Sequence, residues 1–311
     1  MLMTSASFEG VGAERGEIVL PQFQPVEGKL VINAGPSRAG AHDMNTHEIC
    51  PRMRRLARDE RAEPKVAGKL KPTFYLDRGS LVHVGLAHWN ALRAIREQGV
   101  CRVGDLRVTD PGTLYEPIEA IHVAAALNHS DVWSALGEAE MLTRRYIEWD
   151  QHQPSPWHVL AVEVEVGILI DPGELYTARL DMLVRDRTNG LVYGVDHKTA
   201  YYPRDAPAMY GHGYQMLGIQ EIGTQLYGGK WGGIILNCIA SAKTATTPVV
   251  RLSPKAAPAL QARYLDHLRQ QRREMRAEDK LPLNQVPFRL SSCWRDRDGP
   301  CPMHKVCGVR V

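Results

Sequence analysis

The sequence lacks any apolar stretch that approaches membrane-spanning length, although 44% of its 311 residues are hydrophobic. This excludes a protein held in a bilayer by apolar helices. The first ten residues, MLMTSASFEG, also lack a basic segment followed by an apolar one, so they do not resemble a secretory signal. We therefore expect a cytoplasmic protein without a membrane partner.

Repeats, low-complexity tracts and a phosphate-binding loop are missing too. The segment GHGYQM (211–216) has no third glycine, and no strand leads directly into it, so it does not form a nucleotide-binding loop. With 23% charged residues, the composition is that of a soluble globular protein. The length allows one large domain or two small ones.

The net positive charge is small, but positive residues are concentrated in two places. The net charge is +3, yet residues 251–311 hold 13 Lys and Arg against 6 Asp and Glu, which leaves 25 against 29 in the rest of the chain. A second basic cluster is RMRRLARDER (52–61). Such patches suit a polyanionic partner, and solvated helix faces are the alternative interpretation.

Helices and strands are expected in a mixed order. Apolar spacing predicts helices over 46–62, 79–99, 206–228 and 253–281, with one or two more in 115–149, whereas residues 68–79 read as a linker. Alternation predicts a strand over 157–170, and two more strands, LYTARLDMLVRD and GLVYGVDHKTA, are joined by a turn around RTNG. KWGGIILNCIA reads as a short buried strand.

The hairpin around RTNG brings charged residues together. A loop centred on 188–189 or 189–190 puts Asp181 opposite Asp196 or opposite Lys198, and in both registers the three side chains share one face. Two carboxylates at this distance repel unless a cation bridges them, and Mg²⁺ prefers such oxygen ligands. A divalent ion acidifies bound water, and a neighbouring lysine stabilises negative charge on phosphorus. The alternative is a surface ladder of Asp and Lys that contributes little.

The pattern RLDMLV…GLVYGVDHKTA resembles motifs II and III of the PD-(D/E)xK nuclease superfamily, in its RecB-like branch. There, Gly-x-x-Asp is followed by a strand that ends in Asp/Glu-x-Lys. Asp181, Asp196 and Lys198 match the two acids and the lysine, whereas Ala178 stands near the position of the usual glycine. The resemblance implies that Asp181 and Asp196 bind Mg²⁺ or Mn²⁺ and that Lys198 is catalytic.

Two flanking motifs extend the resemblance. GSLVH matches the branch's Gly-x-x-x-His and implies that His83 is a third metal ligand; the alternative is a structural histidine. The later Gln-x-x-x-Tyr motif is half matched, since Gln215 is present but Ile219 replaces the tyrosine. Gln215 is expected to position DNA or the lysine. Glu165 on the preceding strand could reach the metal through water, and an exposed strand acid is its alternative interpretation.

Three of six cysteines fall within the last nineteen residues, a clustering typical of a metal or cluster site. The chain is similar to CRISPR-associated and AddB-type exonucleases and their phage-type homologues, which hold an iron–sulfur cluster with one early and three C-terminal cysteines. This resemblance implies a [4Fe–4S] cluster, and the alternative is Zn²⁺. The cluster ligands would be Cys50, Cys293, Cys301 and Cys307; the zinc ligands would be Cys293, Cys301, His304 and Cys307.

Together these features predict an α/β protein with a PD-(D/E)xK core, in which helices flank a central mixed sheet. Residues 1–45 are a partly ordered lead-in, and 46–311 form the nuclease domain, stapled by Cys50 and 293–307. The expected function is metal-dependent exonuclease cleavage of single-stranded DNA or duplex ends in phage or bacterial recombination, repair or replication, with recombination or helicase proteins as further partners. Bacterial or host cytoplasm is the expected location. The alternatives are a structure-specific endonuclease and a non-catalytic nucleic-acid-binding protein with a C-terminal zinc site.

Overall fold

The computed structural model describes most of the chain between Gln24 and Arg289 and a few residues beyond. The described residues are 24–26, 28–32, 40–58, 74–127, 132–153, 155–210, 213–242, 245–254, 258–289, 294–295, 299–300 and 307. Cys293, Cys301 and His304, named above as candidate ligands, lie outside them.

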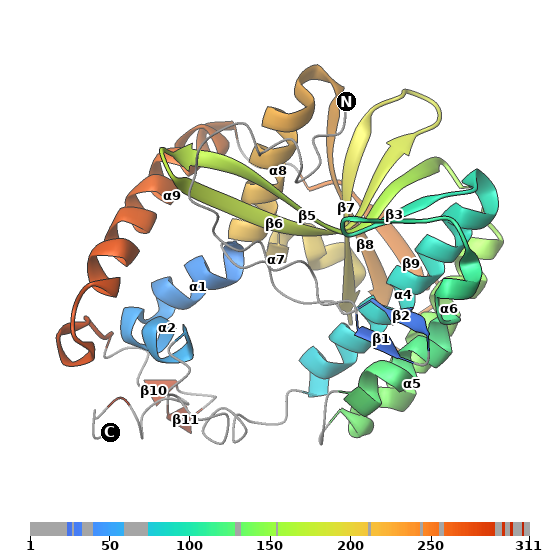
Figure 1. Ribbon diagram of the computed structural model, residues 1–311, viewed down its shortest axis with the longest axis horizontal. Helices are drawn as coiled ribbons and strands as arrows, with labels where there is room; N and C mark the ends of the chain where they lie inside the picture. Colours follow the sequence, from blue (N-terminus) through green and yellow to red (C-terminus); the bar gives the residue numbers. More distant parts are fainter. Residues whose placement is uncertain are drawn as a thin grey trace.

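A seven-stranded mixed sheet forms the centre of the molecule, as predicted. Its strand order is β4-β3-β5-β6-β7-β8-β9, with parallel pairs at β3/β5 and β7/β8 and antiparallel pairs elsewhere. Figure 1 shows the long β5–β6 hairpin running through it. The strands are β3 Cys101–Val103, β4 Leu106–Val108, β5 Trp157–Asp171, β6 Glu174–Asp186, β7 Val192–Ala200, β8 Trp231–Ala240 and β9 Val249–Leu252.

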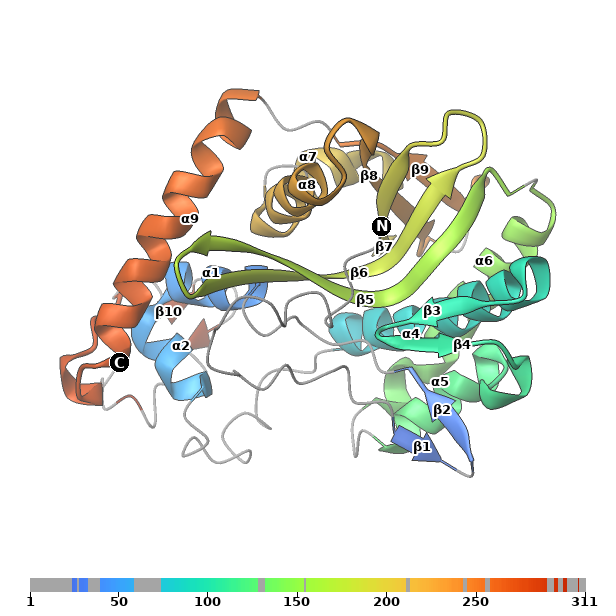
Figure 2. The same cartoon turned by 45° about the horizontal axis from the view of Figure 1, so that its top comes forward.

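Helices cover both faces of this sheet. Helices α4 (Phe74–Gln98), α5 (Pro117–Leu127) and α6 (Trp133–Gln151) pack together on one side, whereas α8 (Tyr214–Tyr227) and α9 (Pro258–Asp279) lie toward the other (Figure 2). Helices α1 (Ala41–Ile49) and α2 (Pro51–Arg58) lie beside α9, and α7 (Ala206–Tyr210) precedes α8. Two short hairpins, β1 (Gln24–Val26) with β2 (Lys29–Val31) and β10 (Trp294–Arg295) with β11 (Gly299–Pro300), stand outside the sheet.

One hydrophobic core packs between the sheet and α4, and another packs on the side of α8 and α9. At one place along β5 and β6, both strands switch the core toward which their side chains point. Val162 and Met182 pack with the α4-side core, but Val164 and Leu180, two residues away on the same strands, pack with the α8- and α9-side core. In a regular strand, residues two apart point to the same side, so Val162 would share a side with Val164, and Met182 with Leu180. Both strands therefore change the faces they present at Glu163 and Asp181.

Two expectations about helices need correction. The expected linker 68–79 is wrong in its second half, because α4 begins at Phe74. Pro72 stands two residues before Phe74, and a proline ahead of the first turn is compatible with a helix. The 206–228 segment forms α7 and α8 rather than one helix.

The glycines of α8 have a packing role. A Cβ at Gly218 would overlap the ring of Tyr176, and one at Gly223 would overlap the ring of Trp231. Both glycines thus let α8 approach closely enough to pack against these two rings, of which Tyr176 is buried and Trp231 half-buried. That gain outweighs the cost of about 1 kcal/mol for each glycine within a helix.

Candidate active site

The β6–β7 hairpin adopts the first of the two predicted registers. Arg185 pairs with Val192 and Met182 with Val195, and continuing this register puts Asp181 opposite Asp196. The loop that sets it is closed by Asp186, whose Oδ1 accepts the backbone N–H groups of Thr188 (2.7 Å) and Asn189 (3.1 Å).

Asp181 lies at the meeting point of β6, β7 and α4. Its Oδ2 accepts the backbone N–H of His197 at 2.6 Å and lies 3.3 Å from Nδ1 of His83. The side chains of His83 and Asp181 are 20% and 12% exposed, so solvent and ions reach both. The structure thus brings together two of the three predicted metal ligands.

Glu163 completes a potential metal site that the sequence reasoning missed. Ligand atoms of His83, Glu163 and Asp181 all lie within 4.8 Å of one another, and Glu163 is only 1% exposed. It has φ 48°, a left-handed conformation unusual for a residue with a side chain. This conformation coincides with the exchange of strand faces and directs the Glu163 carboxylate toward Asp181. Glu165, the acid considered from the sequence, pairs with Arg179 two positions farther along β5.

The three groups perturb one another strongly. Burial and repulsion from Asp181 raise the pKa of Glu163 to about 8. Burial alone would raise the pKa of Asp181, but the charge of His83 and its hydrogen bond outweigh burial and lower it. Burial alone would lower the pKa of His83, and Asp181 reverses the effect, raising the pKa to about 9. A buried cluster of this kind needs a cation, and His83 serves as that cation when no metal is bound.

Asp196, Lys198 and Gln215 form a second, adjoining group. Lys198 Nζ lies 2.7 Å from Asp196 Oδ2 and donates to Gln215 Oε1 at 3.3 Å, while Gln215 Nε2 donates to Asp196 Oδ1 at 2.6 Å. Burial alone would lower the pKa of Lys198, but Asp196 and Asp181 raise it, so its ammonium stays charged. Asp196, predicted as a metal ligand, is turned toward Lys198 and Gln215 in this arrangement.

A buried polar chain supports the strand between the two groups. Asn237 Nδ2 lies 2.9 Å from Nδ1 of His197, and Asn237 Oδ1 accepts Arg251 Nε at 3.4 Å. Arg251 lies between the rings of Trp149 and Trp157 and reaches Asp150 at 3.3 Å. Burial lowers the pKa of His197 to about 4, so this ring is neutral at neutral pH, while the backbone N–H of the same residue donates to Asp181.

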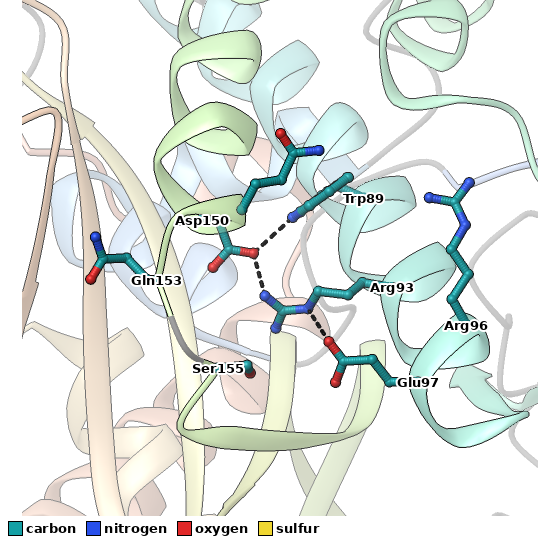
Figure 3. A pocket seen from close by; sticks show the side chains of 8 residues that line it. Trp89, Arg93, Arg96, Glu97, Asp150, Gln153 and Ser155 are labelled. Carbon is teal, nitrogen blue, oxygen red and sulfur yellow. Dashed lines mark hydrogen bonds and ion pairs between the residues drawn. The ribbon is translucent and has the colours of Figure 1, made fainter.

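Asp150 also borders the hollow drawn in Figure 3. The hollow has a volume of about 260 Å³ and lies along α4 between Trp89 and Glu97. Trp89 Nε1 and Arg93 both donate to Asp150. These internal contacts account for the position of the Asp150 carboxylate without a ligand. The hollow begins at Trp89, which is six residues, or about 9 Å along α4, from His83. It is therefore separate from the acidic cluster.

The basic segments are partly used inside the protein. Arg52 donates to the carbonyl of Val286 at 2.7 Å, and Arg54 pairs with Asp279 at 2.9 Å; both arginines are buried. Neither the expected contact with a polyanion nor the alternative of a solvated helix face holds for these two residues, because they connect α2 to α9 and to the residues after it.

Two of the four candidate cluster cysteines are described. Cys50 is 4% exposed at the junction of α1 and α2, and the Sγ of Cys307 lies 4.0 Å from Nη1 of Arg52. Cys307 also packs beside Leu56 of α2. Cys307 thus lies against the helix that begins directly after Cys50.

The comparison with protein families decides the assignment. The model of the PD-(D/E)XK nuclease superfamily matches residues 40–308, which include both groups of site residues. The chain belongs to the PD-(D/E)XK nuclease superfamily. Membership indicates a metal-dependent nuclease that acts on nucleic acid. The RecB-like branch and the iron–sulfur type stay predictions.

Other comparisons add little to this PD-(D/E)XK assignment. A solved structure described as "Crystal structure of SSO0001" shares 16% identity with the chain, covering 60% of this chain and 74% of that one, with a TM-score of 0.28. No curated protein matches the chain. Among the described residues, no helix combines the length and apolar character that crossing a membrane requires.

Proposed function

We propose that this PD-(D/E)XK protein is a Mg²⁺- or Mn²⁺-dependent DNA exonuclease of the RecB-like branch. The observation that carries the proposal is the convergence of His83, Glu163 and Asp181 beside a lysine held by Asp196. Acidic clusters on their own are common, but here a charged lysine adjoins the cluster. That pairing matches the needs of phosphodiester hydrolysis.

The residues that would hold the metal are His83, Glu163 and Asp181. An imidazole and two carboxylates suit Mn²⁺ and also accommodate Mg²⁺, which prefers carboxylates and retained water. A divalent ion bound there would supply Lewis acidity toward water and the phosphate. The register of β6 and β7 puts Asp196 opposite Asp181, and Asp196 would have to turn from Lys198 to join the ligands.

Lys198 acts as a charged donor. Its raised pKa keeps the ammonium protonated, so it orients water and stabilises negative charge on the phosphate oxygens rather than removing a proton. Gln215 bridges Lys198 and Asp196 and holds the two side chains in place. The ring of Tyr210, 5.4 Å from Nζ, covers the ammonium on one side.

An iron–sulfur cluster is the second part of the proposal. Cys50 directly precedes α2 and Cys307 packs against α2, so these two cysteines lie at the same helix, where a [4Fe–4S] cluster shared with Cys293 and Cys301 would sit. Such a cluster would act as a staple, separate from hydrolysis. Anaerobically purified protein should be brown, and Cys50→Ser should bleach it and lower its melting temperature. A colourless protein with one zinc, unaffected by Cys50→Ser, would favour the zinc site of Cys293, Cys301, His304 and Cys307.

The biological role that fits is the processing of DNA ends in phage or bacterial recombination, repair or replication, alongside recombination or helicase proteins. This part rests on the resemblance alone. A cytoplasmic location, in a bacterium or a phage-infected host, belongs to the same proposal.

The test compares linear and closed-circular DNA as substrates. Wild-type protein with Mn²⁺ should degrade linear DNA and spare closed circles, and cleavage of the circles would indicate an endonuclease instead. Asp181→Ala and Lys198→Ala should each lose about a hundredfold or more in rate. Lys230→Ala, at an exposed lysine before β8, is the matched control and should keep full activity. Full activity in Lys198→Ala would refute the site assignment.

A further inference from the structure

The strand that carries Asp196 and Lys198 leads directly to an exposed aromatic pair. Exposure rises along β7 and beyond its end, from 2% at Asp196 to 62% at Tyr201 and 67% at Tyr202. The two rings contact one another edge to face, with centroids 4.8 Å apart. They are the most exposed of the large hydrophobic side chains in the described parts of the chain.

The pair belongs to the rim of the catalytic group. After Tyr202 the chain turns into α7, whose Tyr210 returns over the ammonium of Lys198. Tyr201 is three residues from Lys198, at most about 10 Å along an extended chain. With a rise of about 3.4 Å per nucleotide, this is about three nucleotides from the phosphate that Lys198 would contact.

Positive charge lies at the same end of the sheet. Arg145 donates to the carbonyl groups of Ala240 and Ala242, and the neighbouring Ser241 N–H donates to Ala200, the last residue of β7. Arg204 is exposed two residues after Tyr202, next to the exposed Asp205. Aromatic faces beside a cationic site suit a strand whose bases are unpaired, because each base offers a face for stacking and each phosphate a negative charge.

We propose that Tyr201 and Tyr202 form a stacking platform for unpaired bases next to the scissile phosphate, so that the enzyme engages single-stranded DNA. A duplex keeps its bases stacked on one another and cannot use such a platform without fraying. The inference rests on the proposed DNA cleavage and names the form of DNA that the same site prefers.

The test measures binding of fluorescent oligonucleotides in the inactive Lys198→Ala background. One single strand is unmodified, a second carries abasic sites in place of its nucleotides near the end, and a third substrate is the blunt duplex. Stacking is worth about 1–3 kcal/mol per base, or about five- to 150-fold in Kd. The Tyr201→Ala/Tyr202→Ala protein should lose an amount in this range on the unmodified strand and should no longer distinguish it from the abasic strand.

Matched controls separate stacking from other effects. Tyr201→Phe/Tyr202→Phe keeps the rings and should bind like the parent. Trp133→Ala removes another exposed aromatic side chain, 53% exposed and twelve residues before Arg145 on α6, about 18 Å along the helix, and should change nothing. Equal Kd values for abasic and unmodified strands in the parent protein would overturn the proposal. An equal loss of duplex and single-strand binding in the alanine variant would do the same.

Two further outcomes have distinct meanings. If Tyr201 and Tyr202 instead joined two copies of this chain, light scattering would show a dimer that the alanine variant loses while its DNA affinity stays unchanged, and the platform would be refuted. If the otherwise wild-type enzyme cleaved no DNA at all, the proposed function itself would fail. If wild type and Tyr201→Ala/Tyr202→Ala cleaved single-stranded DNA equally well, the stacking platform would be rejected and the proposed function would stand.

Discussion

Two histidines on α4 should respond to pH in opposite directions in the metal-free protein. His88 is fully buried; its Nε2 accepts the N–H of Ile32 at 3.1 Å, and its Nδ1 donates to the carbonyl of Tyr115 at 3.0 Å. Burial lowers the pKa of His88 to about 4, against a smaller opposing effect of the Tyr115 carbonyl. His83, five residues earlier, has its pKa raised to about 9 by Asp181 in spite of burial.

The sign and size follow from proton linkage. Between pH 6.5 and 4 the unfolded chain binds a proton at His88 that the folded protein does not, so stability falls as pH falls through this range. A shift from 6.5 to about 4 corresponds to about 3 kcal/mol. His83 behaves in the opposite way, because its folded form holds the proton more tightly. Its contribution is present below pH 6.5 and is lost as pH rises through about 9.

Urea unfolding between pH 4.5 and 9 in the presence of a chelator measures both effects. His88→Gln should be less stable than wild type at pH 8, and the difference should shrink toward pH 4.5. His83→Gln should differ most from wild type at low pH, and the difference should shrink as the pH rises toward 9. His197 has its pKa lowered like His88 and remains in every variant, so only differences from wild type are compared. Parallel stability curves for wild type and His88→Gln would refute the reasoning.

Three more substitutions test other parts of the structure. Glu163→Gln should weaken Mn²⁺ binding, measured by calorimetry, about tenfold or more. The fold should stay at least as stable, because a buried carboxylate is removed. Unchanged Mn²⁺ affinity would exclude Glu163 from the metal site. Asn237→Leu should cost about 1–3 kcal/mol in urea unfolding, since the neighbouring polar groups of His197 and Arg251 lose a partner. Gly223→Ala should cost about 1–3 kcal/mol through overlap with Trp231, whereas Gly229→Ala, with open space around it, should be close to neutral.

The sequence predicted the strands of the site well because they are long and their apolar residues alternate over most of their length. The sequence pattern identified all three, and the hairpin register puts Asp181 opposite Asp196, which pairs with Lys198. The register could not be chosen between two possibilities. It depends on a loop in which Asp186 caps two backbone N–H groups, a contact that residue spacing does not reveal.

Glu163 was missed for a different physical reason. In a regular strand Glu163 and Glu165 point to the same face, and nothing in VEVEV marks the backbone conformation that separates them. Counting back along the hairpin would have helped, because Val162 pairs with Met182 and Val164 with Leu180, which puts Glu163 level with Asp181. The short strands β3, β4 and β9 went unpredicted because three or four residues are too few to show alternation.

The contact between α2 and the segment after α9 has a consequence for how the chain is made. Arg52 and Val286 are separated by 234 residues. At a synthesis rate of about 5–20 residues per second, α2 leaves the ribosome about 12–47 s before its partner exists. During this time the cationic face of α2 is unpaired, while the sheet can already form. The joining of α2 to the residues after α9 is therefore a late event, because every strand that carries a site residue is synthesised before Val286.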